Sequence, residues 1–539
     1  MKNVHYLLMG LLTILVISCH KDLEQNPIDP DLFTEVDVYN NAEQARGALA
    51  KLYASFAVTG QQGPTGSPDL DESIISEGFS QYTRILFSLN ELTTDTAVIG
   101  WSDSGLPNFH ELSWSADNPW TRGMYFRLAQ AVSFSNSFIE NAATLSGNSE
   151  VAEYIAEARF LRAYAYYQLM DLFANVPIST TVTADLPEQS SRAEVFAFIE
   201  AELTEIQDLL PTAQSVEYGR VDQVAAWALL SRMYLNAEVF TGTAQYDNAV
   251  VFSDRVIESA YSLNTSDGNN NGSAYDELFL ADNDTNGAQN EFIYAIQFDG
   301  ITTTTWGGAT FMVHAPICGE MNNFAGSLFG VNGGWNGIRT TKGLVDKFAY
   351  SITASDADEH PTAWSDSRAM FFTDGQNYEI DRIPKSSEGY GITKYRNVDI
   401  YGNPGKDSSG NHADVDLAVL RVAEIYLNYA EAVLRGGAGD LSRATTLMNA
   451  LRSRAGAATI NSGDLTLDFV MDERARELYW EGLRRTDLVR DGKFVSGSYL
   501  WPFKAGAANG AASEEFRKIF PLPEDVLLVN PNLTQNPNY

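Results

Sequence analysis

The sequence is poor in cysteine and in basic residues. Its 539 residues include two cysteines, and 36 Lys plus Arg stand against 70 Asp plus Glu, which gives a formal net charge of −34. The shortage of positive charge argues against DNA or an anionic membrane face as a partner, because phosphate groups are bound by cationic surfaces. We therefore predict an acidic protein with no nucleic-acid partner.

Long apolar runs are absent after the N-terminus. Residues 6–17 form a nearly unbroken apolar run. This run is shorter than the about 20 residues that span a bilayer, but it is typical of a signal-peptide core. No later stretch reaches about 18 uncharged apolar residues, so no transmembrane helix is predicted.

The apolar run ends at Val16-Ile17-Ser18-Cys19, which has the aliphatic, small and cysteine positions of a bacterial lipobox. We predict a lipoprotein signal peptide over residues 1–18, lipidation of Cys19 (palmitate included) and a lipidated tether over residues 19–39. An ordinary secretory signal with a chance cysteine is the alternative, and the tether is either a sorting signal or a solvated linker. Since Cys318 then has no intramolecular partner, no disulfide is predicted.

Signatures of enzymes are also missing. There is no HExxH, G-x-S-x-G or G-x-x-x-x-G-K-[ST] motif, and the six histidines show no metal-ligand spacing. The segment Glu473–Arg490 carries Glu473, Glu477 and Glu481 four residues apart among arginines. This spacing favours an ion network on a helix surface over a catalytic acid–base pair. We predict no enzymatic activity and no required cofactor.

Apolar residues make up 44% of the chain and aromatic residues 12%, which suffices for a large core. They recur at helical spacing in many Ala-rich segments, which resemble tetratricopeptide helix pairs, although any all-α bundle gives a similar pattern. We predict a mainly all-α single domain over residues 40–539, with helix pairs as its scaffold. The predicted helices cover residues 40–56, 118–145, 151–173, 192–210, 221–240, 246–262, 417–434, 442–455 and 467–490.

Two regions lack this periodicity. Residues 85–120 have the pattern of an irregular loop, and residues 264–415 contain polar turns, a strand-like run at Phe292–Phe298 and a stretch rich in Gly, Thr and Asn. Long loops within a compact protein are usually functional. We therefore predict long irregular loops at about 60–120 and 264–415, with a few short strands, as the functional part of the chain.

Three tryptophans lie in these loops rather than on apolar helix faces. Trp101, Trp306 and Trp335 are flanked by Gly, Asn, Ser and Asp. A sugar has flat C–H faces that stack on indole rings and hydroxyls that need polar partners, so such loops suit sugar binding. The alternative is that the three rings merely pack the loops onto the core.

The segment Asp282-Asn283-Asp284-Thr285-Asn286 alternates oxygen-bearing side chains. Asp282 and Asp284 are candidate calcium ligands because calcium prefers carboxylate and amide oxygens. The segment lacks the full loop spacing with a terminal Glu, so a polar turn without metal is the alternative.

Several motifs resemble those of the SusD/RagB family of Bacteroidetes surface lipoproteins. They are the lipobox, the helix pairs, the Glu473–Arg490 segment, residues 158–163, residues 423–432 and the C-terminal segment 520–539. Residues 66–71, 90–95, 281–284 and 499–501 are most similar to the starch-binding members of that family. The resemblance covers essentially the whole mature chain. It implies an all-α fold whose loops carry a sugar site, and a bound calcium near Asp282.

The resemblance also implies roles for single residues. Trp101 and Trp335 match aromatic positions of the family's starch-binding arc, and Trp306 stands where the starch-binding members have Tyr. Arg84 matches an arginine that contacts sugar hydroxyls. The Asn expected after Trp101 is replaced by Asp103 or Ser104, because the loop there is one residue shorter.

The implied function is a non-catalytic glycan-binding lipoprotein of the outer membrane, facing the extracellular medium and held by its lipid anchor alone. It would capture starch or maltooligosaccharides for a SusC-like TonB-dependent outer-membrane transporter. A β-glucan or fructan is the alternative ligand. Two further alternatives are a glycoside hydrolase and an assembly factor whose tryptophans face the transporter.

Overall fold

The computed structural model of the chain describes residues 38–352 and 361–539. The predicted signal peptide over residues 1–18, the lipidation site Cys19 and residues 20–37 of the predicted tether lie outside the described residues. Within the described ranges, no helix combines the length and the apolar character needed to cross a membrane.

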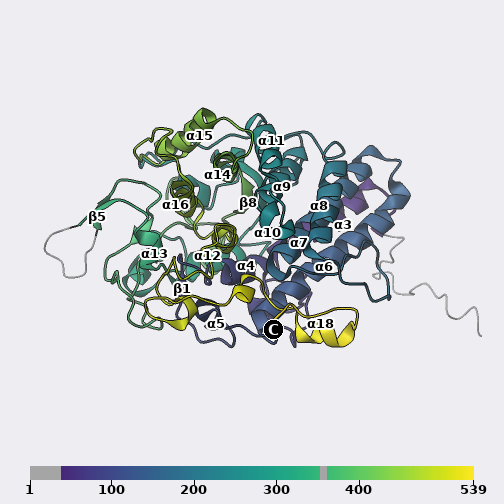
Figure 1. Cartoon of the computed structure of the whole chain (residues 1–539), viewed down its shortest axis with the longest axis horizontal. Coiled ribbons are helices and arrows are strands. Elements are labelled where there is room, and N and C mark those ends of the chain that lie inside the picture. Colours follow the sequence, from purple (N-terminus) through teal and green to yellow (C-terminus); the bar gives the residue numbers. More distant parts are fainter. Residues whose placement is uncertain (1–37, 353–360) are drawn as a thin grey trace, which may run out of the picture.

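A row of stacked helices forms most of the molecule. Within this row α6 packs on α7, α7 on α8, α8 on α9, α9 on α11, α11 on α14, and α14 on both α15 and α16. Figure 1 shows the row running from α3 and α6 at one end to α15 and α16 at the other. The mainly all-α scaffold of tetratricopeptide-like helix pairs is thus confirmed. The stacked helices are α3 (Ala42–Ala57), α6 (Pro119–Ala142), α7 (Ser149–Phe173), α8 (Arg192–Ile206), α9 (Gln223–Leu235), α11 (Tyr246–Ile257), α14 (Val422–Leu434), α15 (Leu441–Arg454) and α16 (Leu467–Leu478).

Shorter helices and pairs of short strands hold the long loops. The short helices are α4 (Tyr82–Asn90), α5 (Asn108–Glu111), α10 (Ala237–Thr241), α12 (Gly308–His314), α13 (Lys342–Val345), α17 (Arg484–Arg490) and α18 (Glu524–Val529). The strands pair antiparallel: β1 (Val98–Ile99) with β3 (Ile338–Arg339), β2 (Phe292–Ile296) with β8 (Leu417–Arg421), β4 (Tyr350–Ile352) with β5 (Pro361–Trp364), and β6 (Phe371–Phe372) with β7 (Gly391–Ile392).

Local sequence explains where the stacked helices begin. The Asn148 side chain accepts a hydrogen bond from the Glu150 amide at the start of α7. Ser191 and Glu194 cap α8 reciprocally, each side chain bonding the other's backbone amide. Such caps satisfy amides that have no partner inside the helix and typically stabilise it by about 1 kcal/mol.

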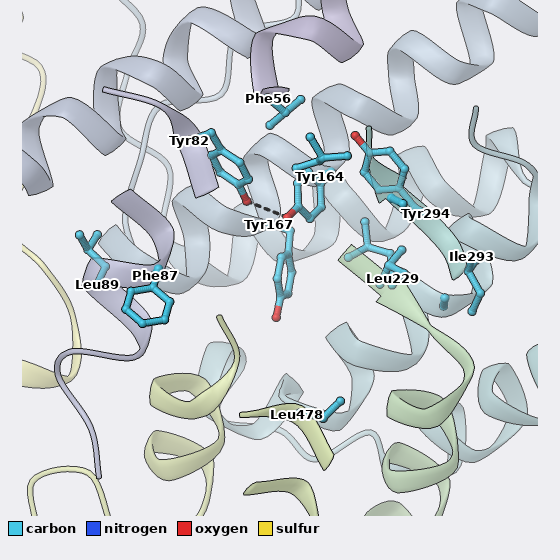
Figure 2. Close-up of a cluster of buried hydrophobic side chains, with 14 of the residues drawn as sticks. Phe56, Tyr82, Phe87, Leu89, Tyr164, Tyr167, Leu229, Ile293, Tyr294 and Leu478 are labelled. Carbon is cyan, nitrogen blue, oxygen red and sulfur yellow. Dashed lines mark hydrogen bonds between the residues drawn. The ribbon is translucent and has the colours of Figure 1, made fainter. Parts of the chain in front are cut away.

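An aromatic cluster joins these helices to the strand pair (Figure 2). Phe56 of α3, Tyr82 of α4, Tyr164 of α7 and Tyr294 of β2 meet there, with ring centroids 5.0 Å apart for Phe56–Tyr82 and 6.1 Å apart for Tyr164–Tyr294. The Tyr82 and Tyr164 hydroxyls share a hydrogen bond of 2.7 Å, which satisfies both groups away from water. Burying each ring contributes roughly 1.5–3 kcal/mol.

Two predicted helices and one predicted loop differ from the structure. The predicted helix over 417–434 begins as strand β8, because Leu417–Arg421 pairs with β2 and this tertiary pairing overrides local helical preference. The predicted loop over 85–120 contains most of α4, whose N-cap is Gln81. The predicted helix over 221–240 is split at Asn236 into α9 and α10.

The predicted surface ion network of Glu473–Arg490 is also wrong, because the network is buried. Glu477 is 0% exposed and bonds Arg368 at 3.0 Å, Arg421 at 2.7 Å and Arg454. The segment is two helices rather than one, because the chain turns between α16 and α17 with positive φ at Trp480 (64°) and Gly482 (76°). Its carboxylates therefore hold distant segments together inside the protein.

Candidate functional site

The pairing of β1 with β3 brings Trp101 and Trp335 together. The Gly100 amide donates to the Gly337 carbonyl at 2.8 Å, and the Trp101 indole N–H donates to the Trp335 carbonyl at 3.1 Å. A Cβ at Gly337 would lie 2.5 Å from the Trp101 ring, so only glycine admits this approach. Two tryptophans that are 234 residues apart in sequence thus share one short strand pair.

Trp306 completes a continuous row of rings, which we call the aromatic arc (Trp101, Trp335 and Trp306). The ring centroids of Trp101 and Trp335 are 6.4 Å apart with planes inclined by 40°, and those of Trp335 and Trp306 are 6.3 Å apart with planes inclined by 58°. All three rings are half-buried. The structure thus brings together the three tryptophans that the sequence singled out, with successive rings turned relative to one another.

Two histidines pack against rings of the arc. His314, at the end of α12, stacks on Trp335 with centroids 5.0 Å apart and planes inclined by only 16°. Its Nδ1 lies 2.7 Å from the Gly333 carbonyl, and its own carbonyl accepts the Trp335 amide at 2.9 Å. His412 packs against Trp306 at 4.8 Å. Burial lowers the pKa of both imidazoles from the usual value.

Arg84 is buried against the rings of the arc. Its side chain is buried, with the guanidinium 5.6 Å from the Trp101 ring centroid and 5.0 Å from that of Phe311. Its Nη1 donates to the carbonyls of Gly78 at 2.9 Å and Trp306 at 3.0 Å. Burial lowers the pKa of Arg84 to about 10, while the negative charge of Asp103 opposes that shift. Arg84 remains cationic at neutral pH and connects two rings of the arc.

Several polar groups at the arc are left without a protein partner. Asp103 is half-buried, and its carboxylate accepts no hydrogen bond from residues 38–352 or 361–539. Within the same ranges, the indole N–H groups of Trp306 and Trp335 and the Nη2 of Arg84 donate no hydrogen bond. The arc therefore combines stacking faces with an unbonded carboxylate and unbonded N–H donors.

The sequence reading missed His314, His412 and Phe311. His314 and His412 lie 21 and 106 residues from the tryptophans they contact, so no local spacing could have indicated them. Phe311 has the pattern of an ordinary core residue of α12 and is 1% exposed.

The proposed calcium ligands Asp282 and Asp284 share one turn. Asp282 accepts hydrogen bonds from the Asn286 side chain and the Ile400 amide, both at 3.2 Å. No group of three or more His, Cys, Asp or Glu side chains with metal-binding geometry occurs in the described part of the chain. The acidic side chains around Asp282 thus do not by themselves fit a calcium site, and calcium binding stays a prediction.

Solved structures define the class of protein to which this fold belongs. The structure superposes on a SusD-like carbohydrate-binding protein from Bacteroides fragilis with a TM-score of 0.70 and 20% identity, covering 92% of this chain and 100% of that chain. It superposes on surface glycan-binding protein A from Bacteroides uniformis with a TM-score of 0.68 and 21% identity, covering 92% and 99%. At these identities the likeness establishes that this chain has the same fold as those proteins.

Sequence comparisons give the family itself. The SusD family model matches residues 361–539, and a second family model, described as starch-binding associating with outer membrane, matches residues 79–235. The chain is 34% identical to the starch-binding protein SusD of Bacteroides thetaiotaomicron over 99% of this chain and 98% of that protein. It is 25% identical to SusD-like protein P2 of Formosa agariphila over 98% of each. The chain belongs to the SusD family.

Proposed function

We propose that this protein is a non-catalytic glycan-binding lipoprotein that captures starch or maltooligosaccharides. Glycans would stack on the aromatic arc and pass to a SusC-like TonB-dependent outer-membrane transporter. The observation that carries this proposal is the turn between successive rings, 40° and then 58°. The 34% identical relative, whose name describes starch binding, supports the same ligand class.

The turn between the rings suits a coiled polymer. An α-glucan such as amylose winds into a helix, so consecutive sugar rings present their faces along a curve. A flat β-glucan presents nearly coplanar faces, which could stack on one ring of the arc but not on its neighbours at 6.3–6.4 Å. The geometry therefore favours an α-glucan over a β-glucan as the ligand.

The free polar groups would orient the sugar. Asp103 can accept a hydrogen bond from a glucose hydroxyl, and the indole N–H groups of Trp306 and Trp335 can donate to hydroxyl oxygens. Nη2 of Arg84 is the remaining donor, since Nη1 already bonds two carbonyls. Because these groups surround a half-open surface, we expect modest affinity that rises with the number of stacked sugar rings.

The absence of catalysis is part of the proposal. Most glycosidases use a pair of carboxylates that flank the scissile bond. Of the residues assigned to the arc and its polar partners, Asp103 is the one carboxylate. Incubation of the purified protein with starch is expected to release no reducing sugar, and release would support the hydrolase alternative instead.

Membrane attachment and the transporter complete the proposal. A lipid on Cys19 would anchor the protein to the outer membrane, and the described residues would face the medium. The family model described as associating with outer membrane supports this placement. Co-purification of the transporter with a chain that binds no glycan would instead support a pure assembly role.

Replacing one ring of the arc tests the proposed site. Trp335→Ala is expected to abolish or strongly reduce the retardation of the protein in a starch-containing gel. Stacking of a nucleic-acid base on one aromatic ring is worth about 1–3 kcal/mol, and we expect a similar order for a sugar, which corresponds to roughly 5- to 150-fold in affinity. The measurement is electrophoretic mobility with and without soluble starch.

Trp227→Ala is the matched control. Trp227 is also half-buried, but it lies on α9 and its indole N–H bonds Gln207 at 3.0 Å, outside the arc. This variant should keep wild-type retardation. Equal retardation of wild type, Trp335→Ala and Trp227→Ala would show that the arc is not the binding site.

A further inference from the structure

A second cleft lies outside the aromatic arc, between α3, β2 and the segment 217–220. Its volume is about 330 Å³, which is near the lower end of the range for ligand sites, about 300–1,000 Å³. Ala50, Ala54 and Ala57 of α3 form one side, and their small side chains leave the space open. Such a volume suits a ligand of one or two sugar-sized rings rather than a polymer.

Two tyrosines line the cleft, and one of them has a hydroxyl without a protein partner. Tyr53 and Tyr294 line it with ring centroids 6.3 Å apart. Tyr294 is 1% exposed, yet its hydroxyl has no hydrogen-bond partner among residues 38–352 and 361–539. Figure 2 shows Tyr294 beside Tyr164, with no hydrogen bond drawn to its hydroxyl. The hydroxyl oxygen itself is not sealed from solvent, so it can bond a polar ligand in the cleft.

Fixed charges and an amide form the rim. Arg46 bonds Glu217 at 2.8 Å across the opening, and Arg220 bonds the same carboxylate at 2.8 Å. The Tyr53 hydroxyl donates to Glu157 at 2.6 Å, which fixes the aromatic wall. The exposed Gln297 also lines the cleft. The charges are paired with one another, so the rim offers donors and acceptors without a net charge that would select an ion.

We propose that this cleft is a second saccharide site, which takes one or two rings of a neutral sugar. The half-buried Tyr53, the unpartnered Tyr294 hydroxyl and a polar but charge-balanced rim offer the apolar contact and hydrogen bonds that a sugar needs. The chemical class of the ligand rests on the proposed function, whereas the site uses none of the residues of the arc.

One loop connects the cleft to the arc. Thr303 lines the cleft, and Trp306 belongs to the arc. Three residues of extended chain span at most about 11 Å, so the two sites flank the same short segment. A chain end bound in the cleft would lie near the glycan on the arc, which would raise its local concentration there.

Short sugars and two classes of variant test the cleft. In the arc-blocked protein Trp101→Ala/Trp335→Ala, we expect maltose to bind still, observed by calorimetry and by saturation-transfer NMR of the sugar. Glucose, cellobiose and sucrose serve as comparison probes. In the wild-type protein, sugar binding in the cleft should leave tryptophan fluorescence unchanged, because no tryptophan is among the described residues that line the cleft. This second readout keeps the test valid if the double variant fails to fold.

Tyr294→Phe removes only the free hydroxyl and should weaken cleft binding roughly five-fold, the usual effect of one neutral hydrogen bond. Ala50→Phe, on the exposed side of α3, should abolish cleft binding by filling it. Tyr167→Phe is the matched control, since Tyr167 is 2% exposed and lies outside the cleft. Starch retardation should be unchanged in all three variants.

Two results would overturn the second site. One is that, for every short sugar, a single site detected by tryptophan fluorescence accounts for the whole binding isotherm of the wild-type protein. The other is unchanged short-sugar binding in both Tyr294→Phe and Ala50→Phe. In either case, the proposed function would still be supported if retardation by starch depends on Trp335. Loss of starch binding by the wild type would count against the proposed function instead.

Discussion

At the scale of single residues, the arc depends on polar groups that hold its rings in place. His314 stacks on Trp335 and bonds the carbonyl of Gly333, so it fixes the loop that carries the ring. Arg84 binds the Trp306 carbonyl while its guanidinium lies near the Trp101 ring. Both residues therefore hold rings that would contact sugar, and Arg84 does so through Nη1, which leaves Nη2 unbonded.

The buried state of His314 predicts a dependence on pH. Its Nδ1 faces a carbonyl and is therefore protonated in the neutral form, while its Nε2 is buried without a hydrogen-bond partner in the described structure. Burial lowers the pKa of His314, and the nearby imidazole of His412 adds to this, while the carbonyls of Gly333 and Asn411 and the charge of Asp407 oppose it. Below the unfolded value of about 6.5, the unfolded chain binds more protons than the folded chain.

This residue's contribution to the free energy of unfolding should accordingly be complete above about pH 6.5 and decline as the pH falls through that value. His314→Phe keeps a flat ring behind Trp335 but removes the titrating group. We expect the variant to lose less stability than wild type between about pH 7.5 and pH 5, measured by urea unfolding. If the free energy of unfolding falls equally with pH in the two proteins, this role of His314 would be contradicted.

At the scale of elements, a turn rather than a long helix determines how α16 and α17 dock on α4. The chain between α16 and α17 reverses at Gly482, whose φ is +76°. The Glu91 side chain accepts the Gly482 amide at 2.9 Å, and Asn90 donates to its carbonyl at 2.8 Å. This turn therefore docks α16 and α17 onto the end of α4, a few residues after Arg84.

Gly482→Ala is expected to destabilise the protein more than a matched glycine replacement. Left-handed backbone costs a non-glycine residue about 1–2 kcal/mol. At Gly482 the added Cβ would also lie 3.2 Å from Leu86, whereas at Gly492, with φ +67°, it would meet nothing within 4 Å. Denaturant midpoints should therefore fall for both variants and further for Gly482→Ala. A smaller effect at Gly482 would contradict the tight docking on α4.

The elements also show what the sequence could and could not predict. The helix pairs were predictable because apolar spacing is local, as along α7, and the three tryptophans stood out because polar loop residues surround them. Strand β8 was not predictable, because it depends on pairing with β2, which lies more than 100 residues earlier in the chain. The same holds for His314 and His412, whose contacts with the arc arise only in the folded chain.

At the scale of the whole molecule, buried ion pairs connect segments that lie far apart in sequence. Glu477 bonds arginines from β8, α15 and the loop before β6. Burial alone would raise the pKa of Glu477, but the charges of Arg454, Arg421 and Arg368 hold it well below its usual range. Its stabilising contribution is therefore present above the unfolded pKa and is lost as the pH falls further into the acid range.

Glu477→Gln should cost about 3–5 kcal/mol, because it leaves buried arginines without their common counterion. Chemical unfolding at neutral pH measures this loss. Starch retardation of the protein that stays folded should be unaltered, since Glu477 contacts no residue of the arc. A loss below about 1 kcal/mol would contradict the role assigned to the buried network.

The net charge of −34 belongs to this scale as well. Many of the carboxylates are paired with arginine inside the molecule, while the proposed glycan site holds one, Asp103. Binding of a neutral glucan should therefore depend little on salt, because exposed charges make little contribution to it. Starch retardation at low and high ionic strength measures this, and a strong loss in salt would contradict a stacking site.

The central claim is that the turned rings of the arc select a coiled α-glucan. Calorimetric titration of the wild-type protein with maltoheptaose and with cellohexaose, under one set of conditions, tests it most directly. We predict measurable binding of maltoheptaose that disappears in Trp335→Ala, and much weaker or no binding of cellohexaose. Equal or tighter binding of cellohexaose, or maltoheptaose binding that survives Trp335→Ala, would contradict the account.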